Sequence, residues 1–482
     1  MSALAIADAA GAAPVRGRRR SGRALTPVVV LALTGALLAV RRAQAPFADG
    51  DILWGTRSGS DILAGHGLPH ADSYSWTAHG VPWVPNSWGW NVLLALAYRL
   101  AGFVGIALLG IALLAATGAL LGVAVRRAGA ATAWGALTMQ IGLGLLALFL
   151  YPRAQLADYA AVVAVPLLVS DALGSSRSAA RRAAIGLVAV QVVWMNLHTT
   201  AVIGPVIVLA VGAGTFASDR SRATALRTLG LAALTAGACL ATPYGTAPIA
   251  HLAEVRAASV GLISEWRPAG FGSPEQILAV IALAFGAVAA LSCVRRRSFD
   301  TVALLAVFAV MTATALRFAP LLMLVAIPPL ARAAGRIRAR PQFVDRICVL
   351  ALAILTVVCA AGAAGFAHPG AQNTSPRLVD ALPHGCRLVN DMGVGGAVIL
   401  SRPDVLVSID SRNDMYGRAA ELTALRVLGD AAYGDRYVTE HRVTCVLAPT
   451  GAPLVTALSH AAQWRVAATD ADRTLLLPRG VR

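Results

Sequence analysis

The sequence predicts a polytopic α-helical membrane protein with about 11 transmembrane helices and a small C-terminal extracytoplasmic α/β domain. Three observations predict this class. Of the 482 residues, 57% are hydrophobic and 13% are charged, whereas a soluble domain has roughly 25% charged residues. The apolar residues form repeated uncharged runs that are long enough to cross a bilayer. Arginines lie in short clusters between these runs.

The net charge of +17 follows the pattern of a membrane protein and not that of a nucleic-acid-binding protein. Basic residues accumulate in the cytoplasmic loops of membrane proteins. Here the arginine clusters recur at every second connection between apolar runs, so we expect a lipid bilayer and no nucleic acid as partner. The connections predicted to be cytoplasmic are 16–23, 126–127, 177–182, 220–227, 295–297 and 332–346.

The chain begins with a basic tail, residues 1–24, which we expect in the cytoplasm. The apolar run at 25–43 has no small-residue cleavage site, so it predicts an uncleaved first span. Arg41 and Arg42 end this span on the outer side, and snorkelling to lipid headgroups is one interpretation. The other spans are expected near 101–125, 131–150, 155–170, 182–197, 201–217, 225–242, 275–294, 299–316, 319–333 and 345–366.

An odd number of spans places the C-terminus on the outer side of the plasma membrane. The chain is therefore divided into a transmembrane domain at 25–366, with a large first outer loop at 44–100, and an extracytoplasmic domain at 367–482. Within the latter we expect a helix near 451–462 and a Gly-rich turn at 393–396. Strands are expected near 389, 397–400, 405–409, 443–447, 464–468 and 473–477.

Cys386 and Cys445 both lie in the predicted outer domain. Because that compartment is oxidising, we predict a disulfide between them. Two buried free thiols are the alternative. The other four cysteines lie in or beside predicted spans, where thiols behave as small apolar groups.

The first outer loop carries a pair of carboxylates, Asp49 and Asp51, next to the first span. One of them can act as a general base while the other orients it, or both can bind a divalent cation such as Mg²⁺ or Mn²⁺. Acidic pairs also occur in loops simply because loops are solvated. The loop is also rich in aromatic residues, which form either an interfacial belt or a surface that stacks on sugar rings: Trp54, Tyr74, Trp76, Trp83, Trp88 and Trp90.

Further polar residues fall in the other predicted outer connections. Charged groups at the ends of membrane spans usually line a cavity. Because all of these residues fall on the outer side, they indicate one outward-facing site built from several loops. A packed or helix-capping histidine is the alternative interpretation of His198. The candidates are Arg153, Gln155, Asn196, His198, Tyr244, Glu265, Trp266 and Arg317.

These motifs resemble the bacterial branch of the GT-C superfamily, polytopic glycosyltransferases that take sugars from polyprenyl-phosphate carriers. The pattern after the first span is Asp-x-Asp followed by tryptophans. Later blocks also match, and the resemblance covers nearly the whole chain. The matching residues include Asp49-Gly50-Asp51, Trp54, Pro69, Asp72, Tyr74 to Thr77, Gly80, Pro82 to Val84, Arg153-Ala154-Gln155, Asn196-Leu197-His198, Pro243-Tyr244-Gly245, Glu265 to Pro268, Arg317 to Pro320, Ile409 to Arg412, Asp414, and Tyr416-Gly417.

The resemblance implies transfer of a sugar from a polyprenyl-phosphate donor, with inversion, to an envelope glycan, lipid or protein acceptor. Asp49 is the preferred base of the pair because it is nearer the first span. Arg153 and Arg317 are the candidate phosphate ligands, since guanidinium binds phosphate in a bidentate fork. The side chains expected to stack on sugar are Trp76, Trp83 and Trp266.

The chain also departs from the family pattern at two places in the first outer loop. Gly55 stands where a His is usual, and Asn86-Ser87-Trp88 stands where His-Glu-Trp is usual. A non-catalytic protein that binds or presents a lipid-linked glycan is therefore a second hypothesis. A transporter is a third, but we detect no inverted repeat.

Overall fold

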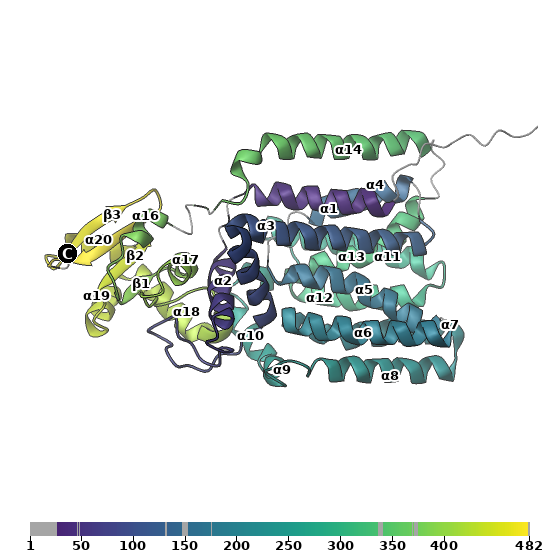
Figure 1. Cartoon of the computed structure of the whole chain (residues 1–482), viewed down its shortest axis with the longest axis horizontal. Coiled ribbons are helices and arrows are strands. Elements are labelled where there is room, and N and C mark those ends of the chain that lie inside the picture. Colours follow the sequence, from purple (N-terminus) through teal and green to yellow (C-terminus); the bar gives the residue numbers. More distant parts are fainter. Residues whose placement is uncertain are drawn as a thin grey trace, which may run out of the picture.

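A computed structural model describes residues 27–45, 47, 49–130, 133–146, 153–174, 176–335, 341–368, 370 and 375–480. In this part of the chain, long helices run side by side and form one bundle, with a smaller domain at one end (Figure 1). The bundle helices are α1 (Pro27–Ala43), α3 (Trp88–Arg127), α4 (Ala133–Leu146), α5 (Gln155–Gly174), α6 (Arg177–Leu197), α7 (Gly204–Asp219), α8 (Arg222–Ala238), α11 (Pro274–Val294), α12 (Phe299–Thr314), α13 (Ala319–Ala334) and α14 (Pro341–Ala361).

These helices lie at the positions of the predicted spans, so the polytopic helical class is confirmed. Six described segments are long and apolar enough to cross a membrane by length and composition: those in α3, α5, α7, α11, α13 and α14. The basic tail 1–24 lies outside the described residues, as does the predicted end of the third span at 147–150.

Close helix contacts in the bundle are made at small residues, as is usual between membrane helices. A Cβ added to Gly118 of α3 would lie 2.4 Å from the backbone oxygen of Leu31 in α1. One added to Gly122 would lie 2.6 Å from the Cα of Val28. Any larger residue at these positions would force the two helices apart.

The first outer loop, predicted only as a large loop at 44–100, is partly helical. It contains α2 (Gly50–Leu63), which lies across the end of the bundle (Figure 1), and the first turns of α3. The helical path of α3 breaks at Ala101 and at Gly102, whose φ is +59°. That value suits glycine, so the chain changes direction before it enters the bundle.

The C-terminal domain contains a four-stranded sheet in the order β1-β2-β4-β3. β1 is parallel to β2, and β4 is antiparallel to both of its neighbours. The strands are β1 (Leu388–Asn390), β2 (Cys445–Pro449), β3 (Trp464–Thr469) and β4 (Arg473–Pro478). The helices around it are α16 (Pro376–Asp380), α17 (Met392–Ser401), α18 (Asn413–Gly429), α19 (Ala431–Glu440) and α20 (Pro453–His460).

Three predicted features of this domain are wrong. Residues 397–400 belong to α17 and not to a strand, and the Gly-rich segment 393–396 is the start of that helix and not a turn. The helix forms because the Asp391 side chain accepts a hydrogen bond from the Gly393 amide and caps it. Residues 405–409 form only isolated bridges, Arg387 with Leu406 and Ser75 with Val407. The other predicted strands and the helix near 451–462 are present.

Candidate active site

A cavity of about 180 Å³ lies where the first outer loop, the bundle and the C-terminal domain meet. The structure brings seven of the predicted site residues into its wall. They are Asp51, Arg153, Gln155, His198, Glu265, Trp266 and Arg317.

Six of these residues meet because they lie at helix ends on the same side of the bundle, and α2, which carries Asp51, lies across that end. Arg153 precedes α5, and His198 follows α6 as its C-cap. Glu265 and Trp266 form the short helix η3 (Ser264–Trp266) ahead of α11, and Arg317 lies in η4 (Leu316–Phe318) ahead of α13. Antiparallel helices place every second connection at one end of the bundle, so residues far apart in sequence share a wall.

Arg153 lies among three carboxylates. Its Nε donates to Asp49 Oδ2, and its Nη1 donates to Glu265 Oε1 at 2.7 Å. Asp51 Oδ2 is 3.7 Å from the same Nε. Burial lowers the pKa of Arg153, but the three carboxylates outweigh it and hold the pKa well above the ordinary value. The guanidinium is therefore always charged.

The two carboxylates of the first outer loop have different environments. The Asp49 side chain is 7% exposed and accepts from the Asp51 amide, which caps α2. The Asp51 side chain is 36% exposed and lines the cavity. Its Oδ1 accepts from Ser411 Oγ at 2.6 Å and from Trp54 Nε1 at 3.2 Å. Desolvation raises the pKa of Asp51 to about 6, partly opposed by Arg153.

The expected divalent cation does not fit this pair. Asp49 Oδ1 accepts from the Asp51 amide and Oδ2 from Arg153, while Asp51 Oδ1 already accepts two hydrogen bonds. Among the described residues, no group of three or more His, Cys, Asp or Glu side chains is placed to hold a metal ion. A divalent cation at Asp49 and Asp51 would have to displace the Arg153 guanidinium.

Arg317 has a different neighbour. Its guanidinium lies over the Trp266 ring, 4.6 Å from the centroid. Arg317, Trp266 and His198 also line a second, adjacent cavity of about 130 Å³, which we call the apolar extension. The wall of this extension is largely apolar, with Val84, Val202, Ile203, Pro248, Leu252 and Phe318.

His198 is held by a carboxylate inside the bundle. Its Nδ1 lies 2.8 Å from Asp158 Oδ2, and Asp158 Oδ1 accepts from Trp194 Nε1 at 2.7 Å. The hydrogen bond to Asp158 fixes the orientation of the His198 ring, and the residue lines both cavities. Both interpretations of His198 therefore apply, because the residue is packed inside the bundle and also forms part of the cavity wall.

Two predicted residues, Asn196 and Tyr244, lie outside the cavity and hold the loops around it. Asn196 Oδ1 accepts from Trp88 Nε1 at 3.0 Å, and its amide donates to the Ala241 carbonyl at 2.8 Å. Tyr244 donates to the Pro69 carbonyl at 3.0 Å. Both side chains therefore join connections from different parts of the sequence.

Trp76 and Trp83, expected to stack on sugar, are placed away from the cavity. Trp83 is 1% exposed and packs edge-on against Trp54, with ring centroids 5.7 Å apart. Trp76 donates to the Leu388 carbonyl at 2.8 Å and lies against the Arg387 guanidinium. Their surfaces are taken up by packing between the first outer loop and the C-terminal domain, which leaves Trp266 as the predicted stacking residue in the cavity wall.

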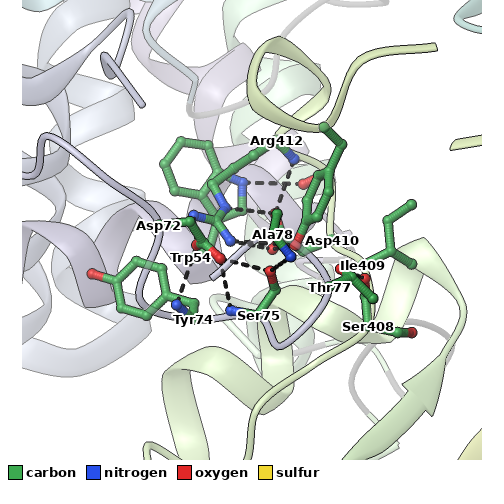
Figure 2. A network of polar contacts seen from close by, with 12 residues as sticks. Trp54, Asp72, Tyr74, Ser75, Thr77, Ala78, Ser408, Ile409, Asp410 and Arg412 are labelled. Atoms are coloured by element: carbon green, nitrogen blue, oxygen red, sulfur yellow. Dashed lines mark hydrogen bonds and ion pairs between the residues drawn. The ribbon is translucent and has the colours of Figure 1, made fainter. Parts of the chain in front are cut away.

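A buried ion-pair network joins the first outer loop to the C-terminal domain (Figure 2). Arg412 donates to Asp72 Oδ1 at 2.6 Å and to both oxygens of Asp410, at 2.8 and 2.6 Å. Arg412, Asp72 and Asp410 have no exposed side-chain surface. The Asp72 carboxylate also accepts from Ser75. This network fixes the segment that presents Ser411 to Asp51.

The cavity wall also includes Trp54 and Trp90 of the aromatic loop, together with residues to which the sequence assigned no role, among them Asn91, Ser411, Asn413 and Asp414. A signal was present for some of them, since Ile409 to Arg412 and Asp414 belong to the resembling blocks. Burial raises the pKa of Asp414.

The departure at Gly55 has a steric counterpart. A Cβ added there would lie 2.9 Å from Asn91 Oδ1, so the Asn91 side chain occupies the space that a larger residue would need. At the other departure, Asn86 and Ser87 lie in the cavity wall.

The disulfide between Cys386 and Cys445 is present in the structure. It connects the residue two before β1 to the first residue of β2. The four other cysteines form no disulfide and are buried.

The chain was compared with known proteins. No protein-family model matches it, and no curated protein matches it in sequence at a significant level. Solved structures do match. The archaeal oligosaccharyltransferase AglB from Archaeoglobus fulgidus, in complex with an inhibitory peptide and a dolichol-phosphate, aligns with a TM-score of 0.58 and 12% identity over 87% of this chain and 69% of AglB.

ArnT from Cupriavidus metallidurans aligns over 93% of this chain. In the apo state the TM-score is 0.57 at 14% identity, with 97% of ArnT covered. For ArnT bound to undecaprenyl phosphate, the TM-score is 0.53 at 13% identity, and 96% of ArnT is covered. The chain therefore has the fold of the polytopic membrane glycosyltransferases of the GT-C type.

Proposed function

We propose that the protein is a membrane glycosyltransferase that transfers a sugar from a polyprenyl-phosphate donor to an acceptor on the outer face of the plasma membrane. The observation that carries this proposal is the cavity in which Asp51 and Arg317 share one wall, with an apolar extension beside Arg317. The fold supports it, because AglB was solved with a dolichol-phosphate and ArnT with undecaprenyl phosphate.

Asp51, and not the Asp49 preferred from sequence, is our candidate for the base. Asp51 lines the cavity, whereas Asp49 caps α2 and pairs with Arg153. A pKa of about 6 also suits a base that works near neutral pH. The acceptor hydroxyl gives its proton to Asp51 while its oxygen attacks the anomeric carbon. The bond from that carbon to the phosphate oxygen breaks, polyprenyl phosphate leaves, and the configuration inverts.

Arg317 is our candidate for the phosphate ligand. Arg153 is already engaged by Asp49 and Glu265, which leaves Arg317 as the better placed of the two predicted guanidinium groups. The apolar extension beside Arg317 suits the first isoprene units of the lipid, and Trp266 beside it suits a sugar ring. A guanidinium there stabilises the negative charge that the departing phosphate gains.

The orientation in the membrane is part of the proposal. Arg153, His198, Glu265 and Arg317 lie at the end of the bundle that faces the C-terminal domain. The arginine clusters at the end of α3, at the start of α6 and directly after α11 lie at the opposite ends of these helices. The positive-inside rule then puts the cavity and the C-terminal domain outside the cell.

The test is complementation of a deletion strain, with the linkages of cell-envelope glycans and glycolipids as the readout. We expect the deletion to lack one glycosidic linkage that the wild-type gene restores. Asp51→Asn should not restore it, although the variant reaches the membrane in equal amount. Asp404→Asn, a change at the surface of the C-terminal domain, is the matched control and should restore it. Full restoration by Asp51→Asn would rule out Asp51 as the base.

The same strains separate the second hypothesis. A protein that only binds or presents a lipid-linked glycan would leave every linkage in place in the deletion strain. Purified protein would then bind polyprenyl phosphate without consuming a polyprenyl-phosphate sugar.

A further inference from the structure

One guanidinium occupies the centre of the carboxylate cluster beside the cavity. Arg153 contacts Asp49 and Glu265 through hydrogen bonds and lies 3.7 Å from Asp51. The three acidic residues come from the start of α2 and from η3, two elements that are far apart in the sequence. Without a cation between them, three carboxylates this close would repel one another strongly.

A guanidinium can satisfy such a cluster in place of a metal ion. It is planar, carries five N–H donors and cannot lose its charge in a protein. The Arg153 side chain is 28% exposed and lines the cavity, so it is part of the site itself.

The contacts of the carboxylates agree with this role. Asp49 has both oxygens engaged, and Asp51 Oδ1 accepts from Ser411 and Trp54. Asp51 Oδ2, 3.7 Å from Arg153 Nε, lies beyond hydrogen-bond distance from it. We assign the contact with the acceptor hydroxyl to this oxygen, because Oδ1 already accepts two hydrogen bonds and Asp51 lines the cavity.

We propose that the Arg153 guanidinium takes the position of a divalent cation in this site, joining Asp49, Asp51 and Glu265, and that transfer requires no divalent metal. This inference rests on the proposed function for its statement about transfer. The position of the Arg153 guanidinium does not depend on the proposed function. It can be tested by metal binding to purified protein without any substrate.

The first experiment measures Mn²⁺ binding to the purified full-length protein by electron paramagnetic resonance. We expect the Mn²⁺ binding of the wild-type protein and of Asp51→Asn to be the same, because neither holds an ion at Asp51. Arg153→Gln removes the charge and leaves three carboxylates together, so we expect it to gain one Mn²⁺ per chain. The double variant Arg153→Gln/Glu265→Gln should lose that ion again.

A wild-type protein that binds Mn²⁺ and loses it in Asp51→Asn would overturn the proposal. A correctly folded Arg153→Gln variant that gains no ion would overturn it as well. Size-exclusion profile and thermal unfolding establish whether the variant is folded. If it is not, the wild-type titration with Asp51→Asn still decides the question.

The second experiment concerns transfer. Membranes that carry the wild-type protein should form product at the same rate with and without EDTA, and added Mg²⁺ or Mn²⁺ should change the rate by less than twofold. Activity that EDTA abolishes and Mn²⁺ restores would overturn the proposal. Absence of product under every condition would count against the glycosyltransferase itself, while the Mn²⁺ titration would still report on Arg153.

Discussion

The environment of Asp51 determines how transfer should depend on pH. Desolvation raises the pKa of this carboxyl group to about 6. A general base works only in its unprotonated form, which for Asp51 is the main form above this pKa. We therefore expect kcat/KM to be level at pH 7 to 8 and to fall about tenfold per pH unit well below pH 6. The measurement is a pH–rate profile in membranes.

Asp49 provides the control for this profile, because its negative charge raises the pKa of Asp51. In Asp49→Asn the charge is gone and Arg153 is freed from one partner, so both effects lower the pKa of Asp51. The residual activity of the variant should persist to lower pH. An acidic limb at the same pH in both proteins would mean that another group titrates.

Arg412 is the residue whose loss should most affect stability at the domain junction. Its side chain and those of Asp72 and Asp410 are fully buried. Removing one partner of such a network leaves uncompensated buried charge and costs about 3–5 kcal/mol. We expect Arg412→Met to lower the free energy of unfolding by this amount, as measured by denaturant titration in detergent.

The matched control for this variant is Arg402→Met, at the surface of the same domain. Arg402 pairs with Asp404, and both side chains are partly exposed. We expect a smaller loss of unfolding free energy than for Arg412→Met, because water can screen a pair whose side chains are 18% and 21% exposed. Equal losses in the two variants would show that burial of the Arg412 network adds nothing.

The sequence predicted which side chains meet in the cavity better than it predicted how they are oriented. Arg153, His198, Glu265 and Arg317 were found because hydropathy locates helix ends. The choice between Asp49 and Asp51 depends on where α2 begins. Asp49 caps that helix and Asp51 lies in its first turn, and one sequence does not fix a helix start so closely.

At the scale of elements, the disulfide should stabilise the C-terminal domain. Cys386 and Cys445 are 59 residues apart and join the segments of β1 and β2. Closing a loop of that length is worth about 4 kcal/mol in the chain-entropy model. We expect Cys386→Ala/Cys445→Ala to reduce the stability of the domain by this amount in the denaturant titration.

The matched control is Cys359→Ala, which removes a free thiol from α14. This variant should leave the unfolding transition of the C-terminal domain unchanged. A reducing agent should destabilise the wild-type domain and have no effect on the double variant. A wild-type transition that does not respond to reduction would contradict the predicted contribution.

The elements that the sequence identified are those with a strong periodic or hydropathic signal. The bundle helices are long apolar runs, and the strands at 464–468 and 473–477 are bounded by turn residues. Among the helices that the sequence did not predict, α2 and α17 were missed for opposite reasons. The segment of α2 contains Gly, Ser and Thr and is not apolar enough for a span. The segment of α17 is a short apolar run, which alone cannot be told from a buried strand.

For the whole molecule, the proposed orientation predicts which surfaces meet the medium. Single cysteines can be introduced at Glu440 in α19 and at Arg295 after α11, both exposed. The native cysteines that form no disulfide are buried, which keeps background labelling low. In intact cells, a membrane-impermeant maleimide should label Glu440→Cys, and should label Arg295→Cys only after permeabilisation. The opposite pattern would invert the orientation and place the cavity in the cytoplasm.

The buried network around Arg412 also has a consequence for synthesis. Asp72 leaves the ribosome 340 residues before its partner Arg412, a delay of roughly 17 to 70 seconds at usual translation rates. During this time the first outer loop has no counter-charge for Asp72 and no Ser411 to hold Asp51. The cavity is therefore completed only after Ser411, Asn413 and Asp414, its last lining residues, have been made. A nascent chain that ends before these residues lacks part of the cavity wall, so we expect no transfer from it.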